Sequence, residues 1–415
     1  MVQLPAVFTE KTRLLMGEER FERYLQSFEE EPPVSIRLNP MKASPNPSKG
    51  RGVQVLDGER VPWCRHAYYL KQRPNFTMDP LFHAGCYYVQ EASSMFLDEV
   101  LRQYSPLLLE GSGEALDMCA APGGKSTLLR SALPKDCVLY SNEPIRNRAN
   151  ILLENVTKWG YENHLVTNNY PKDYRKSKLM FDLILCDVPC SGEGMFRKDE
   201  ATIREWSPKN VEKCWQLQRD IVDDAWACLN AGGLLIYSTC TFNTKENEEN
   251  IRYFLEQYDD MEVVPINIQP EWNITGSLLE GFHEPVYRFI PGISRGEGLF
   301  MCVLRKSLPP TPSKRRGRQE ALNILTSPLR HQTSDIKVDL DYKSAISYLR
   351  GEALVLPEDT PRGEVTVCFQ GHPLGPMKNI GSRANNLYPK EWRIRTTHIP
   401  NEYEAILRNT EQNTD

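Results

Sequence analysis

The chain has 415 residues, which is long enough for about two to three domains of ordinary size. Apolar residues make up 40% of it and charged residues 25%, a globular balance that excludes a disordered or collagen-like chain. The formal net charge is -5, so the overall charge does not favour a nucleic-acid partner, and RNA would have to bind at local basic patches.

Localisation and redox state follow from the hydropathy pattern and the cysteines. No run approaches the roughly 18 consecutive apolar residues that a membrane span needs, and residues 1–16 carry no secretory signal pattern. We therefore expect a soluble, cytoplasmic protein without a membrane partner. The eleven cysteines are scattered without a Cys-x-x-Cys pair, which predicts reduced thiols rather than a disulfide framework or a metal site.

The first part of the chain, residues 1–110, is predicted to form an N-terminal α+β module that faces RNA. Apolar residues at helical spacing predict an amphipathic helix within 17–28. The segment SIRLNP (35–40) alternates like a strand. Residues 43–62 are rich in Ser, Pro, Gly and Lys, which is typical of a loop.

Residues 111–305 show a different pattern, in which short apolar runs alternate with helical segments. Gly160 ends one helical pattern, Ser207 with the proline after it begins another, and Asn243 with Glu246 resembles a capping box. This alternation predicts a doubly wound, Rossmann-like α/β domain with a mostly parallel sheet. The apolar runs are ALDM, CVLYS, HLVT, FDLILC, LLIYSTC, YRFI and LFMCVL.

Beyond this domain the composition changes abruptly. Residues 306–334 are rich in proline and positive charge, which predicts a basic linker. Residues 335–415 are predicted to form a small β-rich domain, with strands at 353–356 and 365–370. Its basic residues, interleaved with Tyr388 and Trp392, are Lys378, Arg383, Lys390, Arg393 and Arg395.

A glycine-rich turn, DMCAAPGGKST, leads from the first strand of the α/β domain into a helix. Backbone amides at such a helix start can approach a phosphate or a nucleotide-like cofactor closely. The GGKST end suggests a P-loop, with FDLILCD as the strand that holds Mg²⁺. However, a P-loop needs glycine five residues before Gly124, and that position is Cys119.

The alternative is a Rossmann-like cofactor domain, in which an acidic residue about 20 positions further on binds the ribose hydroxyls. Glu143 closes the strand CVLYSNE, 19 positions after Gly124, and can accept hydrogen bonds from both hydroxyls. The simpler interpretation of Glu143 is a surface residue that caps the next helix.

Two cysteines and an aspartate end neighbouring predicted strands. Asp187 and Cys190 follow FDLILC, and Cys240 ends LLIYSTC. In an open α/β sheet the ligand lies beyond the carboxyl ends of the strands, so these residues should face one crevice with the glycine-rich turn. A single cysteine at a strand end is more often a small buried residue than a nucleophile. Two cysteines beside a carboxylate and a cofactor loop favour a catalytic role over a structural one.

A thiol beside an adenosine-type cofactor suits methyl transfer to a pyrimidine. Carbon 5 becomes nucleophilic only after a thiolate adds to carbon 6 and turns the ring into an enamine. Asp187, hydrogen-bonded near ring nitrogen 3, would stabilise the charge that develops. Lys125 either lowers a thiol pKa, holds the acidic groups, or is simply a solvated lysine of a first helical turn. These residues alone do not decide whether Cys190 or Cys240 attacks.

Four motifs together resemble the Sun/RsmF-type RNA cytosine-5 methyltransferases, which use S-adenosylmethionine. The segment HAGCYYVQEASSM resembles the family's segment before the catalytic domain, and SIRLNP resembles its N-terminal module. The last part of the chain resembles the PUA-like domain of the larger rRNA-modifying members. The four motifs are DMCAAPGGKS (117–126), NE (142–143), DVPCSGEGMFRKD (187–199) and STCTF (238–242).

The resemblance implies a role for each matched residue. It makes Cys240 the nucleophile and Cys190 the thiol that helps release the product, and it places Asp187 beside the cofactor and the target base. It also implies that Glu143 holds the ribose. The implied cofactor loop consists of Cys119, Ala120, Ala121, Pro122, Gly123, Gly124 and Lys125.

The chain departs from the family pattern at two places. Many relatives have alanine where this chain has Val188, which adds volume without removing a chemical group. They also carry an adenine-binding aspartate after the third strand, where this chain has Asn168 and Asn169. Asn168 or Asn169 is expected to substitute, because an amide oxygen can accept a hydrogen bond from an amino group.

The resemblance therefore predicts methylation of carbon 5 of a cytosine in RNA. The PUA-like domain favours 16S rRNA, in a ribosomal subunit or its precursor, over tRNA. Two other classes compete: a P-loop NTPase, which leaves Cys240 without a role, and a non-catalytic RNA-binding factor, which would be expected to have lost one of the two thiols. Oligomeric state cannot be predicted from this sequence.

Overall fold

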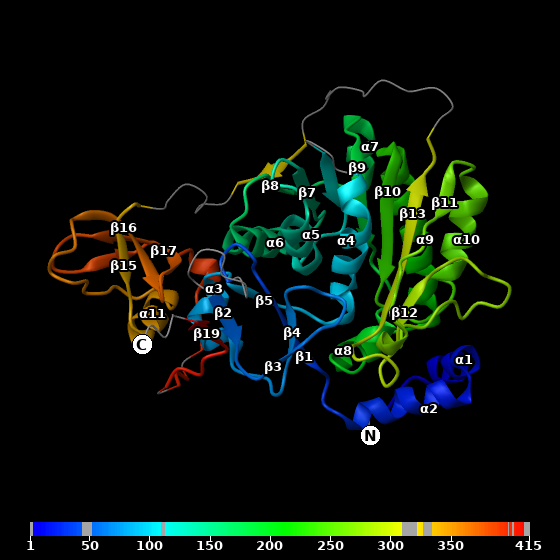
Figure 1. Ribbon diagram of the computed structural model, residues 1–415, viewed down its shortest axis with the longest axis horizontal. Coiled ribbons are helices and arrows are strands. Elements are labelled where there is room, and N and C mark those ends of the chain that lie inside the picture. Colours follow the sequence, from blue (N-terminus) through cyan, green and yellow to red (C-terminus); the bar gives the residue numbers. More distant parts are fainter. Residues whose placement is uncertain are drawn as a thin grey trace.

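The computed structural model shows a three-part molecule (Figure 1). A large central sheet carries helices on both faces, a smaller N-terminal sheet lies beside it, and a β-rich C-terminal domain lies beside the N-terminal sheet. Within the described ranges, no helix is long and apolar enough to cross a membrane. The described residues are 3–43, 52–108, 113–308, 322–326, 334–396, 398–400 and 402–410.

The N-terminal part combines a helical hairpin with a small antiparallel sheet. Its elements, with short 3-10 helices labelled η, are α1 (Ala6–Met16), α2 (Glu18–Gln26), η1 (Ser27–Glu29), β1 (Val34–Leu38), β2 (Gly52–Val55), β3 (Gly58–Arg60), β4 (Ala67–Leu70), η2 (Phe76–Met78), α3 (Pro80–His83), β5 (Tyr87–Val89), η3 (Ser93–Phe96) and α4 (Leu97–Leu108). The sheet has the order β3-β4-β1-β5. The helix expected within 17–28 and the strand expected at 35–40 are confirmed by α2 and β1.

The loop predicted for 43–62 is wrong where the structure describes it, because β2 and β3 lie there. Strand β3 pairs with β4 a few residues later. Strand β2 pairs with residues 407–410 at the far end of the chain. Local composition carries no signal for a pairing partner so far away in the sequence. The remaining residues of the predicted loop, 44–51, lie outside the described part of the chain.

The central domain is the predicted doubly wound α/β fold. Its elements are β6 (Glu114–Asp117), α5 (Gly124–Ala132), β7 (Val138–Asn142), α6 (Arg146–Trp159), β8 (His164–Thr167), α7 (Pro171–Ser177), β9 (Phe181–Asp187), η4 (Glu193–Met195), α8 (Glu200–Glu205), α9 (Pro208–Ala227), β10 (Leu229–Thr239), α10 (Glu248–Gln257), β11 (Met261–Val263), η5 (Pro270–Trp272), β12 (Tyr287–Phe289), β13 (Leu299–Lys306) and β14 (Ile324–Leu325). The sheet order is β11-β13-β10-β9-β6-β7-β8-β14, with β12 beside β13. Strands β10, β9, β6, β7 and β8 are parallel, and the outer strands are antiparallel.

The parallel strands are buried on both faces, which explains their continuous apolar runs. In β9, Leu183 and Leu185 pack in the core that α4 and α5 cover, whereas Ile184 and Cys186 pack in the core of α9 and α10. Figure 1 shows α9 and α10 on one side of the sheet and α4 and α5 on the other.

The predicted helix ends are confirmed at two positions and wrong at the third. Gly160, in the left-handed conformation, ends α6, and the Ser207 hydroxyl accepts a hydrogen bond from a backbone N–H of the first turn of α9. Asn243 and Glu246 do not cap α10, which begins at Glu248. Their side chains serve another purpose, described below.

The C-terminal domain is β-rich, as predicted. Its elements are β15 (Lys337–Asp339), α11 (Tyr342–Leu349), β16 (Gly363–Phe369), β17 (His372–Asn379), β18 (Ala384–Asn386), η6 (Lys390–Trp392) and β19 (Leu407–Thr410). The strand predicted at 365–370 is β16, whereas 353–356 forms only a single bridge through Leu354. Most of the predicted linker lies outside the described residues, but its described part includes β14, which extends the central sheet at β8.

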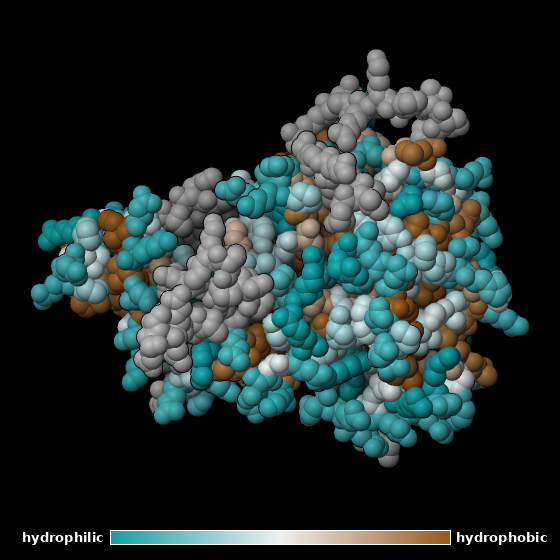
Figure 2. All heavy atoms as spheres, in the orientation of Figure 1, coloured by the Kyte–Doolittle hydropathy of each residue, from teal (hydrophilic) through white to brown (hydrophobic). Residues whose placement is uncertain are grey.

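The N-terminal sheet and the C-terminal domain share one apolar core. Helix α3 packs against α11 and β17, and β19 returns to pair with β2, as Figure 1 shows. The Tyr342 hydroxyl donates to the Met78 carbonyl at 3.1 Å, and the Tyr403 hydroxyl donates to the Asp79 carboxylate at 3.0 Å. The surface in Figure 2 is predominantly hydrophilic, with scattered hydrophobic patches.

Candidate active site

A cavity of about 630 Å³ opens where the parallel strands end. The cavity is lined by residues from the ends of four different strands or the loops that follow them, among them Cys119, Glu143, Asp187, Cys190 and Cys240. The structure therefore brings together the residues that the sequence placed at one sheet edge. Ligands of open α/β sheets bind at this edge.

Asp187, which lines this cavity, forms an ion pair with Lys125. Lys125 Nζ lies 2.9 Å from Asp187 Oδ2, and the Ser238 hydroxyl donates to Asp187 Oδ1 at 2.6 Å. Burial by itself lowers the pKa of Lys125, but the Asp187 carboxylate outweighs burial, and the net pKa lies above its usual value. Lys125 therefore carries a positive charge at neutral pH and orients the carboxylate.

The two candidate thiols touch each other. The Sγ atoms of Cys190 and Cys240 are 3.0 Å apart, and the Cys240 backbone N–H donates to the Cys190 sulfur at 3.2 Å. The pKa of Cys190 lies well above its usual value because of its hydrogen bond with Cys240 and because of burial. Cys190 is therefore a thiol at neutral pH and can donate its S–H to the Cys240 sulfur. All eleven cysteines of the chain are described and free.

The glycine-rich turn has the geometry of a cofactor loop. Gly123 adopts φ +118°, and a Cβ there would lie 3.2 Å from the Leu152 side chain, so only glycine fits without strain. The turn is tied to the end of β7, because Ala120 N–H donates to the Asn142 carbonyl at 2.8 Å and the Asn142 side chain donates to the Met118 carbonyl at 3.1 Å. Asn142 is a support that the sequence analysis did not assign.

Glu143 is buried between the start of α6 and the cavity. Its side chain is 2% exposed, so it is not the surface residue that the simpler interpretation expected, and Oε1 accepts the backbone N–H of Ile145, the residue before α6, at 2.9 Å. Its other oxygen lies 3.3 Å from Arg148 Nη1. The carboxylate also lines the cavity, so hydroxyl groups of a ribose there would meet an acceptor. Ribose binding by Glu143 stays a prediction.

Asn168 and Asn169 brace the neighbouring loop. The Asn168 amide donates to the carbonyls of Glu143 at 2.7 Å and Pro144 at 2.9 Å. The Asn169 amide oxygen accepts the backbone N–H of Asn323, beside β14, at 3.1 Å. The NH₂ group of Asn168 is thus occupied with backbone, and its predicted role at adenine remains untested.

The remaining predicted loop residues surround the cavity or support it. Ala121 lines the cavity and its carbonyl accepts from Arg148, whereas Ala120 is buried behind it. The Pro122 carbonyl accepts a hydrogen bond from Asn155 at 2.8 Å, and Gly124 begins α5. At the other end of the chain, four of the five predicted basic residues are exposed, Arg393 is half-buried, and Tyr388 is buried.

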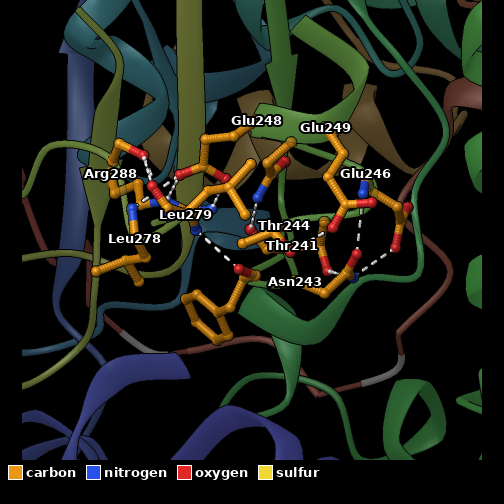
Figure 3. A network of polar contacts seen from close by, with 12 residues as sticks. Thr241, Asn243, Thr244, Glu246, Glu248, Glu249, Leu278, Leu279 and Arg288 are labelled. Carbon is orange, nitrogen blue, oxygen red and sulfur yellow. Dashed lines mark hydrogen bonds and ion pairs between the residues drawn. The ribbon is translucent and has the colours of Figure 1, made fainter. Parts of the chain in front are cut away.

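A polar network that the sequence analysis missed surrounds the loop after Cys240. The sequence did contain a signal, since two acids, Glu193 and Glu246, stand within a few residues of the two cysteines. Glu193 accepts from the backbone of the Cys240 loop and Glu246 accepts from the backbone of the Cys190 loop. Figure 3 shows Asn243 turned toward Glu246 in this network.

A buried ion pair anchors the same loop from the other side (Figure 3). Arg288 and Glu248 are 1% and 0% exposed and pair through two contacts. Arg288 Nη1 also donates to the Phe242 carbonyl at 2.8 Å. Because a buried charge without a partner is costly, this pair fixes the backbone two residues beyond Cys240.

Three profiles of known families match the chain. The family described as 16S rRNA methyltransferase RsmB/F matches residues 107–305. The N-terminal domain of 16S rRNA methyltransferase RsmF matches residues 4–92, and the methyltransferase RsmF PUA domain matches residues 336–394.

Similar proteins extend the match over most of the chain. The ribosomal RNA small subunit methyltransferase F of Serratia proteamaculans is 31% identical over 335 residues, which cover 76% of this chain and 67% of that protein. The protein of the same description from Erwinia tasmaniensis is 26% identical over 471 residues, covering 93% of this chain and 96% of that protein. A solved methyltransferase homologue from Pyrococcus horikoshii has a TM-score of 0.60 and 27% identity, over 74% of this chain and 96% of the other.

Proposed function

The chain belongs to the RsmB/F family of 16S rRNA methyltransferases, and we propose that Cys240 is its nucleophile and Cys190 its second catalytic thiol. The reaction is methylation of carbon 5 of a cytosine in 16S rRNA with S-adenosylmethionine. The observation that carries this proposal is the contact of the two sulfurs, 3.0 Å apart, beside the Lys125–Asp187 pair. The P-loop and non-catalytic alternatives leave this arrangement unexplained.

The different surroundings of the two thiols support these roles. Cys190 holds its proton, since its pKa is well above the usual value, and its S–H is within reach of the Cys240 sulfur. The positive charge of Lys125 also acts on Cys240. A thiolate is the reactive form of cysteine, and Cys190, which keeps its proton, is therefore the poorer nucleophile of the two. Cys240 is therefore the better placed nucleophile.

In the proposed reaction the Cys240 sulfur forms a bond to carbon 6 of the cytosine, and its electron pair passes into the ring. Asp187, held by Lys125 and Ser238, faces the cavity and would hydrogen-bond the edge of the base that gains charge. Bound S-adenosylmethionine supplies the electrophilic methyl group that carbon 5 accepts. The Glu143 carboxylate and the turn at Gly123 are the groups that would hold this cofactor.

Release requires carbon 5 to pass its proton to water or another base in the cavity, while the carbon–sulfur bond breaks and its electron pair returns to Cys240. The Cys190 thiol lies against that sulfur and would stabilise it as it leaves. The cytosine must leave its stack to enter a cavity at the sheet edge, so we propose that a single-stranded or opened segment of 16S rRNA, in a ribosomal subunit or its precursor, is the substrate.

The test compares variants of the two cysteines on a denaturing gel after incubation with S-adenosylmethionine and substrate RNA. Cys240→Ala should be inactive and give no slow-migrating covalent complex, because nothing adds to carbon 6. Cys190→Ala should give a persistent complex, because release is impaired. Cys214→Ala, which removes a half-buried thiol on α9, is the matched control and should behave as the wild type.

A complex with Cys240→Ala and none with Cys190→Ala would reverse the two roles. If both variants keep activity and neither gives a complex, covalent catalysis is wrong for this protein.

A further inference from the structure

We propose that Glu193 and Glu246 are positioning residues, which hold the two cysteine loops together and thereby keep the Cys190 thiol in contact with the Cys240 sulfur. We call the hydrogen bonds that these two glutamates and Asn243 make between the loops the clasp. Each glutamate belongs to one loop and accepts hydrogen bonds from the backbone of the other. This inference rests on the proposed roles of the two cysteines, and it assigns the device that sets their distance.

Glu193 lies three residues after Cys190 and reaches across to the loop after Cys240. Its Oε2 accepts the backbone N–H groups of Phe242 at 2.8 Å and Asn243 at 2.9 Å. Its Oε1 accepts from the Asn243 side-chain amide at 3.1 Å and from the Trp206 indole at 3.0 Å. The glutamate is 2% exposed.

Glu246 makes the reciprocal connection. It follows Cys240, and its Oε2 accepts the backbone N–H of Ser191, the residue after Cys190, at 3.0 Å. The same oxygen accepts from the Gln218 side chain at 2.8 Å. Gln218 in turn donates to the carbonyl of Pro189, the residue before Cys190, at 2.9 Å. The Cys190 turn is therefore held on both sides.

Asn243 joins the two halves of this clasp. Its side-chain NH₂ lies 3.1 Å from Glu193 Oε1 and 2.8 Å from Glu246 Oε1, and its side-chain oxygen accepts the Glu246 backbone N–H at 2.9 Å. Figure 3 shows its side chain turned toward Glu246. Every group that meets either carboxylate is a donor, so each site requires a side chain that only accepts.

Burying two carboxylates close together costs free energy, which other interactions must offset. Burial raises the pKa of Glu246, and the charge of Glu193 adds to this. Apolar side chains would close the same space without that cost. The hydrogen bonds do what apolar packing cannot, because they fix the direction and register of two backbone turns.

The substitutions Glu193→Gln and Glu246→Gln test this role with little change of shape. Either glutamine turns an NH₂ group toward a donor, so one hydrogen bond of the clasp is replaced by a repulsive contact. Glu249→Gln is the matched control, because Glu249 lies in the same region and accepts only the Thr244 hydroxyl, at 2.8 Å, among the described contacts. Asn243→Ala is a second variant, which removes the bridging amide.

The first measurement does not depend on methyl transfer. Diamide removes two electrons and two protons from neighbouring thiols and leaves an S–S bond, and mass spectrometry of the digested protein follows the Cys190–Cys240 disulfide. Glu193→Gln, Glu246→Gln and Asn243→Ala should each slow its formation at least about tenfold, the factor that the loss of a buried hydrogen bond allows. Glu249→Gln should stay within about twofold of the wild type. Binding of S-adenosylmethionine, followed by calorimetry, reports that each variant is folded.

The second measurement follows turnover. Loss of the clasp should lower kcat and lengthen the life of the covalent RNA complex while KM for RNA stays unchanged, because release depends on the Cys190 position. Disulfide formation at the wild-type rate in folded Glu193→Gln and Glu246→Gln variants would contradict the positioning role of the two glutamates. Slower disulfide formation, together with a Cys190→Ala variant that never forms the RNA complex, would leave the role of the two glutamates standing and refute the proposed cysteine roles instead.

Discussion

Deletion of residues 307–415 should destabilise the N-terminal module and not merely remove an RNA-binding domain. The deletion removes the Tyr342 and Tyr403 hydroxyls that bond to Met78 and Asp79. It also uncovers the face of α3 that packs against α11 and β17, and it leaves β2 without β19. The magnitude follows from these contacts.

Met78 and Leu81 are each 3% exposed in the shared core. Returning two such side chains to water costs about 3 to 6 kcal/mol, and the two lost hydrogen bonds add about 1 to 3 kcal/mol. The sum, about 4 to 9 kcal/mol, is comparable with the 5 to 15 kcal/mol that stabilises a typical domain. The truncated chain should therefore lose the fold of its N-terminal sheet.

Thermal unfolding and limited proteolysis measure this effect. The truncated chain should unfold in a separate transition at lower temperature, and protease should cut within residues 52–96 while the central domain resists. A truncated chain that melts as the full chain does, with an intact N-terminal sheet, would refute the shared core as a source of stability. Tyr403→Phe, which keeps the ring but loses the hydrogen bond to Asp79, should give a smaller shift in the same direction.

Three further predictions concern the cofactor, pH and RNA. Glu143→Ala should weaken S-adenosylmethionine binding by about 1 to 3 kcal/mol, and wild-type affinity in calorimetry would make Glu143 a capping residue only. Burial raises the pKa of Asp117 to about 7, so its contribution to stability is present at low pH and is lost as pH rises toward 7. Asp117→Asn should remove that loss, which is on the order of 4 kcal/mol, and a stability difference from the wild type that does not change between about pH 4 and 8 in urea titrations would contradict this. Charge reversal of Lys378 and Arg383 in the full chain should weaken RNA binding and flatten its dependence on salt, and an unchanged salt slope would place the RNA elsewhere.

The central fold could be predicted because its signals are local. The apolar runs of β6 to β10 and the glycine-rich turn lie within short stretches, and parallel strands place their ends at one edge. Strands β2 and β14 could not be predicted in this way. Their partners are 352 residues away at β19 and 157 residues away at β8, as counted between the paired residues Val55 and Leu407 and between Thr167 and Ile324.

The candidate site was predictable to the level of its reacting groups and not of their supports. Asp187, Cys190 and Cys240 stand at strand ends, where the sequence pattern gives their neighbours. Glu193 and Glu246 act across a gap of about 50 residues, as the separation of Ser191 and Glu246 shows. The pattern of Asn243 and Glu246 fits a capping box equally well, and only the position of the second loop distinguishes the two uses.

The N-terminal hairpin completes this support from outside the sheet. Phe8 of α1 contacts Phe196, in the loop after Cys190, with ring centroids 4.9 Å apart. Tyr24 of α2 contacts Phe242, in the loop after Cys240, at 5.4 Å. The same hairpin therefore packs on both cysteine loops, which the two glutamates connect by hydrogen bonds. Because well-packed aromatic pairs contribute about 0.5 to 1.5 kcal/mol beyond burial, the module predicted to face RNA also limits how far the two sulfurs can separate.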